Sequence, residues 1–105
     1  VKGLTISGGE PFMQIAETLE LTKKAKFIGL NVLIYTGYTY EELISKNDIS
    51  IKDILMYADY LVDGPFQINK KSYNLEFKGS SNQRIIDLPA TLKTGKVITK
   101  SFVYS

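Results

Sequence analysis

Short apolar segments alternate with longer amphipathic segments along the first sixty residues of this chain. Residues 4–6, 31–36 and 60–63 have the length and the apolar, branched composition of strands. Between the first two, apolar side chains recur at helical spacing over residues 12–28, and Gly29 gives the signal for the helix end. This order predicts a right-handed βαβ unit with parallel strands. The continuous run 31–36 is typical of a strand buried on both faces.

The helices expected from this pattern differ in length. The first is expected to bury one apolar face made of Phe12, Ile15, Ala16, Leu19, Leu21, Ala25 and Ile28. Thr39 and Glu42 predict the capping box of a short helix, and Ser50 is expected to cap the next one. Residues 84–88 predict a fourth strand, 89–94 a short turn or helix ended by Gly95, and 97–104 an extended segment.

Composition narrows the possible chemistry. The 105 residues predict a single α/β domain over 1–105, and 44% hydrophobic content is enough for a packed core. A net charge of +2 favours neither nucleic acid nor an anionic membrane, and no apolar run approaches the roughly 20 residues that span a bilayer. A cytoplasmic location is therefore expected. Because the chain has neither Cys nor His, it lacks thiolate metal ligands and the commonest general base.

Polar and glycine residues follow each of the first three predicted strands. Gly8, Gly9 and Glu10 follow the first, Thr36 and Gly37 end the second, and Asp63 ends the third. The carboxyl ends of parallel strands meet at one edge, where open sheets and barrels bind ligands. The glycines let a ligand approach the backbone closely. An alternative stays open, in which the glycines only make tight connections and the acid only caps a turn.

A polar stretch precedes the fourth predicted strand. Residues 66–83 lack periodicity, and long segments of this kind inside small domains are often functional. Hydroxyls, amides and a guanidinium then follow in series and could hydrogen-bond a polar ligand or the backbone of a partner. The alternative is a solvated loop whose arginine pairs with a surface acid. The series of hydroxyls, amides and guanidinium consists of Gly79, Ser80, Ser81, Asn82, Gln83 and Arg84.

Four segments together carry a resemblance to a known family. Residues 5–11 (TISGGEP) resemble the Gly-Gly-Glu element of radical S-adenosylmethionine enzymes. Residues 35–43 (YTGYTYEEL), 58–66 (ADYLVDGPF) and 79–84 (GSSNQR) are similar, in the same order and spacing, to the glycyl-radical activases of anaerobic ribonucleoside-triphosphate reductase. The resemblance covers positions 3 to about 88. It implies a partial (β/α) barrel of parallel strands with its site at the strand carboxyl ends.

The resemblance also implies an activity. Members of this family use a [4Fe-4S] cluster to reduce S-adenosylmethionine to a 5′-deoxyadenosyl radical. That radical takes a hydrogen atom from a glycine of the partner, the anaerobic ribonucleoside-triphosphate reductase. In such enzymes the cofactor supplies the chemistry and the protein positions and shields it.

Site residues follow from the resemblance position by position. Gly8, Gly9 and Glu10 would receive the methionine ammonium group of S-adenosylmethionine, and Thr36 and Gly37 would line the cofactor. Asp63 matches a position where related activases place an acid near the site, whereas Pro65 stands where some of them have a lysine. The segment 79–84 would face the partner or complete the pocket.

One departure from the family pattern is decisive. The cluster of the family is held by a Cys-x3-Cys-x2-Cys loop, and this chain has no cysteine. No metal ligand and no catalytic residue are therefore assigned, and the chain alone is expected to be inactive. We expect it to be the C-terminal part of an activase that lacks the N-terminal cluster segment. The barrel would then be incomplete, and its unpaired strand edge predicts self-association.

Two other functions remain open at this level. The chain could be a non-catalytic α/β module that binds a small anion or a protein partner at the same strand edge. It could also be a structural fragment that binds nothing.

Overall fold

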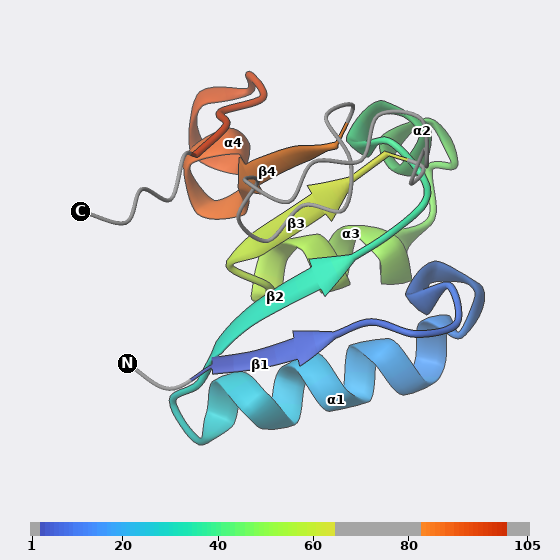
Figure 1. Cartoon of the computed structure of the whole chain (residues 1–105), viewed down its shortest axis with the longest axis vertical. Coiled ribbons are helices and arrows are strands. Elements are labelled where there is room, and N and C mark those ends of the chain that lie inside the picture. The colour runs from blue at the N-terminus through green and yellow to red at the C-terminus, as the bar shows by residue number, and fades with distance from the viewer. Residues whose placement is uncertain (1–2, 65–82, 101–105) are drawn as a thin grey trace.

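The computed structural model describes residues 3–64 and 83–100, and these form an α/β fold (Figure 1). Four strands form one sheet in the order β1-β2-β3-β4. They are β1 (Gly3–Ile6), β2 (Asn31–Tyr35), β3 (Tyr60–Asp63) and β4 (Arg84–Asp87). The first three are parallel, as predicted.

The expectation that all strands are parallel is wrong for β4. Arg84, the first residue of β4, lies opposite Asp63, the last residue of β3, and the two strands are antiparallel. The chain therefore re-enters the sheet at the edge where it left it. A parallel strand would require the chain to cross to the opposite edge first. As a result, the beginning of β4 contributes to the same edge as the ends of the other strands.

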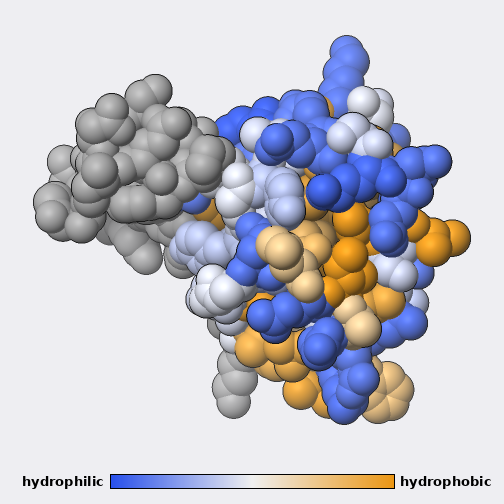
Figure 2. Space-filling view, turned by 90° about the vertical axis from the view of Figure 1, so that its right-hand side faces the viewer, coloured by the Kyte–Doolittle hydropathy of each residue, from blue (hydrophilic) through white to orange (hydrophobic). Residues whose placement is uncertain are grey.

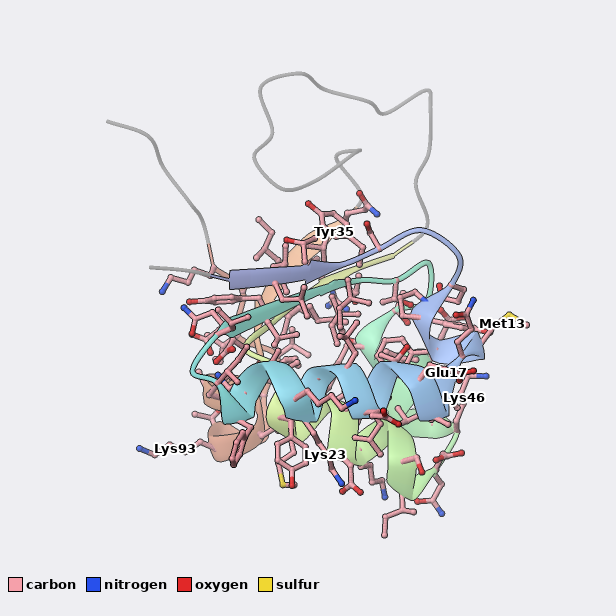
Figure 3. All side chains as sticks on the ribbon, turned by 90° about the horizontal axis from the view of Figure 1, so that it is seen from below. Met13, Glu17, Lys23, Tyr35, Lys46 and Lys93 are labelled. Carbon is pink, nitrogen blue, oxygen red and sulfur yellow. The ribbon has the colours of Figure 1, made fainter. Side chains whose placement is uncertain are left out.

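Helices lie against one side of this sheet (Figure 3). Two pack against each other beneath the strands, α1 (Ile15–Phe27) and α3 (Ile49–Tyr57). A single turn of 3₁₀ helix, η1 (Pro11–Met13), precedes α1, and α2 (Tyr40–Ser45) precedes α3. The last helix is α4 (Leu88–Thr94). Within the described ranges, no helix has both the length and the apolar character that crossing a bilayer requires.

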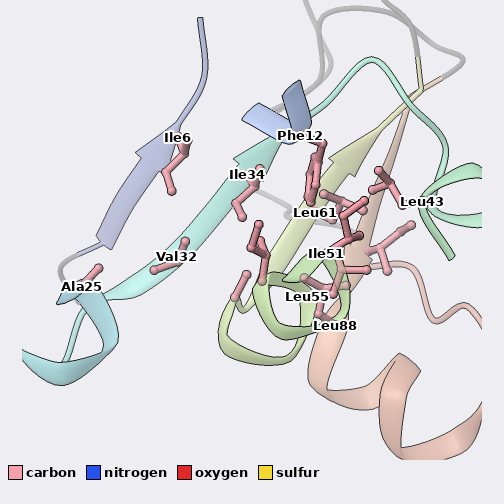
Figure 4. Packing of buried hydrophobic residues seen from close by; sticks show 13 residues of the cluster. Ile6, Phe12, Ala25, Val32, Ile34, Leu43, Ile51, Leu55, Leu61 and Leu88 are labelled. Carbon is pink, nitrogen blue, oxygen red and sulfur yellow. The ribbon is translucent and has the colours of Figure 1, made fainter. Parts of the chain in front are cut away.

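The core lies between the strands and these helices (Figure 4). Val32 and Ile34 of β2 are fully buried against the helices, whereas Leu33 and Tyr35 on its other face are only half-buried. The prediction that this strand is buried on both faces is therefore wrong for the part of the chain that the structure describes. The alternation places Tyr35 on the side of the sheet opposite the helices (Figure 3).

The buried face of α1 also differs from the prediction. Four of the predicted apolar residues are buried or packed against the core, namely Phe12, Ile15, Leu19 and Ala25. Thr18 and Thr22 are buried on the same side, whereas Leu21 and Ile28 are 44% and 69% exposed. Ala16, which was also expected inside, is exposed. The helical turn of about 100° per residue explains this, because Thr18, Thr22 and Ala25 share one face of α1 that excludes Ala16 and Leu21. The two buried threonines satisfy their hydroxyls by donating to the carbonyl oxygens of Pro11 and Thr18.

The structure tests the predicted helix ends individually. The capping box is confirmed, since Thr39 and Glu42 each accept a hydrogen bond from the backbone of the other. The cap of α3 is Asp48 rather than Ser50, because the Asp48 carboxylate reaches the amides of residues 50 and 51. Gly29 has φ +83° and follows the last helical turn of α1, as its end signal predicted.

Candidate functional site

The turn after β1 is built from two glycines and an acid. Gly8 has φ +97°, a conformation that residues with a side chain rarely adopt. A Cβ atom on Gly9 would lie 3.3 Å from the Gln14 side-chain nitrogen. Glu10 then caps η1 by accepting a hydrogen bond of 3.0 Å from the amide of Phe12. The glycines thus allow the chain to turn sharply and present the carboxylate immediately after the strand.

Glu10 connects this turn to the end of β2. Its Oε2 accepts a hydrogen bond of 2.7 Å from the Thr36 hydroxyl, and its Oε1 accepts one of 2.7 Å from the Gly37 amide. A Cβ atom on Gly37 would lie 3.4 Å from Oε1, at the limit of ordinary contact. The structure therefore brings the sequence-predicted residue Glu10 to Thr36 and Gly37, which follow it by 26 and 27 residues in the chain.

A cleft of about 410 Å³ opens at this edge of the sheet. Figure 2 views the molecule from the side toward which the carboxyl ends of the parallel strands point. Among the described residues that line it, Glu10 is the only one with a formal charge at neutral pH. A carboxylate with no lysine or arginine beside it in the described part of the cleft wall favours a cationic ligand. The residues that line the cleft are Gly8, Glu10, Pro11, Tyr35, Thr36, Gly37, Gly64 and Gln83.

Asp63 lies at the same edge but is paired within the protein. Only 1% of its surface is exposed, and its two carboxylate oxygens accept hydrogen bonds of 3.0 and 2.5 Å from Arg84. The backbone amide of Tyr40 donates a third, of 2.8 Å. Asp63 is not among the residues that line the cleft. Its contacts anchor β4 and the start of α2 to the end of β3.

Arg84 contacts a second acid on the surface. Its guanidinium donates hydrogen bonds of 2.6 and 3.3 Å to Glu41, whose side chain is 61% exposed. The hydrogen bonds that Arg84 donates to Asp63 and, next, to Glu41 raise the pKa of Arg84 above its ordinary value. In return, the Arg84 guanidinium lowers the pKa of Glu41. Of the two roles considered for Arg84, pairing with an acid is thus observed, although the main partner is buried rather than at the surface.

Gln83 completes the cleft wall from the other side of the sheet edge. It is 7% exposed, and its amide nitrogen donates a hydrogen bond of 2.9 Å to the carbonyl oxygen of Gly64. Gln83 was part of the predicted segment 79–84, and residues 79–82 lie outside the described part of the chain.

Sequence reasoning did not assign three of the cleft residues to the site, namely Pro11, Tyr35 and Gly64. Two-residue alternation along β2 would have placed Tyr35 on the open side of the sheet, opposite the buried Ile34. Burial raises the pKa of the Tyr35 hydroxyl, so this side chain remains neutral at physiological pH. Gly64 has φ +95°. Its position directly after a predicted strand was the sequence signal that could have assigned it to this edge of the sheet.

A metal site is not found in the part of the chain that the structure describes. No three histidine, cysteine, aspartate or glutamate side chains come together there, and the whole sequence contains no cysteine and no histidine. The ligands that an iron–sulfur cluster requires are thus missing from these residues.

Comparison with known proteins supports the resemblance noted from the motifs. Curated relatives are named anaerobic ribonucleoside-triphosphate reductase-activating proteins. Those of Pasteurella multocida and Vibrio cholerae are 38% and 36% identical to this chain over 88 residues. The one of Enterobacteria phage T4 is 32% identical over 89 residues.

These alignments cover about 80% of this chain but only 53–54% of each relative. The chain therefore spans about half the length of the curated relatives it matches. No solved structure matches it. A family model described as a 4Fe-4S single cluster domain matches residues 1–86, which is most of the chain. The chain consequently belongs to the family of 4Fe-4S single cluster domains, even though it contains none of the cysteines that would bind a cluster.

Proposed function

We propose that this chain is part of a radical S-adenosylmethionine activase of anaerobic ribonucleoside-triphosphate reductase and that its cleft binds S-adenosylmethionine. The observation that carries the proposal is the cleft at the carboxyl ends of β1, β2 and β3, where Glu10 is the one charged residue among the described residues of the lining. The names of the curated relatives support the same assignment.

The cleft matches the charge of this cofactor. S-adenosylmethionine carries an ammonium and a sulfonium group, and the carboxylate of Glu10 attracts both. Gly8 and Gly37 have no side chain, so backbone atoms are accessible beside that carboxylate. The volume of about 410 Å³ lies within the usual range of small-molecule sites, roughly 300–1,000 Å³. Glu10 and the glycine turn would hold the ammonium end, while Thr36, Gly37 and Asp63 stand at the neighbouring strand ends.

The cofactor, when bound, would supply the 5′-deoxyadenosyl group for hydrogen abstraction from a glycine of the reductase. The residues of this chain do not fit a [4Fe-4S] cluster, because thiolate ligands are absent from its sequence. No step through a cluster is therefore assigned to these residues. We propose that the chain alone binds the cofactor and is inactive in cleaving it.

The proposal extends to fold and partner. Parallel β1, β2 and β3 would form part of a partial (β/α) barrel, and residues 79–84 would face the reductase or complete the pocket. A cytoplasmic location accords with this role.

An anion-binding module is the competing proposal, and the site favours it less. A phosphate or sulfate in this cleft would lie against the carboxylate of Glu10 with no cationic side chain among the described lining residues to compensate. We expect phosphate to give no saturable binding.

Isothermal titration of S-adenosylmethionine into the chain tests the proposal. We expect weak, saturable binding that is lost in Glu10→Ala. Glu20→Ala serves as the matched control, because Glu20 lies on α1 and pairs only with the exposed Lys24. Equal binding by the wild type and Glu10→Ala, or saturable phosphate binding instead, would overturn the assignment.

A further inference from the structure

The hydroxyl proton of Thr36 is used within the protein. It donates a hydrogen bond of 2.7 Å to Oε2 of Glu10 and accepts one of 3.1 Å from the amide of Tyr38. Thr36 is only 4% exposed, although it contributes to the cleft wall. A hydroxyl has a single proton to donate, and that proton is directed at the carboxylate. Thr36 therefore has no donor left for a ligand.

The carboxylate of Glu10 is held from three sides. The amide of Phe12 and the hydroxyl of Thr36 both donate to Oε2, and the amide of Gly37 donates to Oε1. An ionised carboxylate offers about four acceptor positions. Oε1 consequently retains the capacity for one further hydrogen bond, on a residue that lines the cleft.

We propose that Thr36 is a positioning residue, which fixes the Glu10 carboxylate so that one acceptor position on Oε1 is presented to the ammonium group of a ligand. This inference rests on the proposed function for the identity of that ligand. It assigns Thr36 a role through Glu10, instead of the direct cofactor contact that the resemblance implied.

The arrangement is sensitive to a single hydroxyl. Thr36 joins the end of β2 to the turn that follows β1, and the two segments are 26 residues apart in sequence. Without the hydroxyl, the amides of Phe12 and Gly37 are the two remaining donors to the Glu10 carboxylate, so its position is less tightly fixed. Charge-assisted hydrogen bonds are stronger than neutral ones, so the loss at this position is measurable.

Isosteric replacement tests the proposal with S-adenosylmethionine as the probe. Thr36→Val keeps the shape of the side chain, and we expect it to weaken binding about tenfold. Thr36→Ser restores the hydroxyl and is expected to bind within about twofold of the wild type. Thr94→Val is the matched control, since Thr94 is an exposed residue of α4 that bonds only nearby backbone.

Two further comparisons separate positioning from a general structural effect. In a Glu10→Gln background, Thr36→Val is expected to cause no additional loss, because both changes act on one contact. Binding of 5′-methylthioadenosine, which lacks the ammonium group, is expected to be the same in the wild type and Thr36→Val. Independent, additive losses, or an equal loss for both ligands, would overturn the proposal.

A measurement without ligand distinguishes failure of this inference from failure of the proposed function. The Gly37 amide is bonded to Glu10, so its hydrogen exchange is expected to accelerate in Thr36→Val and Glu10→Gln but not in Thr36→Ser. If the wild type does not bind S-adenosylmethionine, the proposed function fails and Gly37 exchange alone decides the positioning role. Unchanged exchange in Thr36→Val refutes that role in either case.

Discussion

Removal of the Arg84 guanidinium is the most informative perturbation of stability. Asp63 is 1% exposed and receives two of its three hydrogen bonds from Arg84. In Arg84→Met the carboxylate remains buried, charged and bonded only to the amide of Tyr40. Breaking a buried ion pair from one side costs about 3–5 kcal/mol.

The lower end of that range applies here. The Arg84 side chain is 34% exposed, so water reaches the space that it leaves, and one hydrogen bond to Asp63 persists. We therefore expect Arg84→Met to lower the free energy of unfolding by about 3 kcal/mol. Glu41→Gln removes the exposed partner of the same guanidinium, and a surface pair of this kind contributes less than about 1 kcal/mol.

Urea unfolding followed by far-ultraviolet circular dichroism at pH 7 measures both losses. The double variant Asp63→Asn/Arg84→Met is expected to be more stable than Arg84→Met alone, because it no longer buries an unpaired charge. A loss in Arg84→Met no larger than that in Glu41→Gln would refute the reasoning. So would a double variant that is less stable than Arg84→Met.

Three other predictions concern the turn glycine, pH and the sheet edge. Gly8→Ala and Gly29→Ala each place a side chain at positive φ without a steric clash. Each is expected to lower the free energy of unfolding in urea by about 1–2 kcal/mol. Only Gly8→Ala should also weaken S-adenosylmethionine binding. Arg84 lowers the pKa of Glu41 from its ordinary 4.5. The stability that this ion pair contributes is therefore present above pH 4.5 and is lost as pH falls through the lowered pKa. Urea midpoints measured against pH should show this loss in the wild type and not in Glu41→Gln. Strand β1 ends the described sheet, so light scattering should detect self-association that Thr5→Lys reduces.

Features set by neighbouring residues were predictable from the sequence. The three parallel strands, the Thr39–Glu42 capping box and the glycine after α1 depend on short-range patterns, and the structure confirms them. The meeting of Glu10 with Thr36 and Gly37 followed from one further rule, that parallel strands end at one edge.

Features that depend on long-range packing were missed or wrongly predicted. Thr18 and Thr22 are buried beside Ala25, while Leu21 is exposed, because the side of a helix that docks against the sheet is not set by composition alone. Asp48 and Ser50 are both residue types that favour a helix N-cap. Asp48 takes that position because α3 begins at Ile49, which the sequence alone does not specify.

The sequence by itself determined the order of strands and helices, the glycine and acid at the first strand end, and the absence of cluster ligands. These are properties of residue type and local spacing. Only the tertiary structure decided that Asp63 is paired with Arg84 and withdrawn from the cleft, while Glu10 is the charged residue among the described residues that line the cleft. The difference arises because β4 runs antiparallel and brings a guanidinium to the end of β3, a contact between residues 21 positions apart that no local pattern specifies.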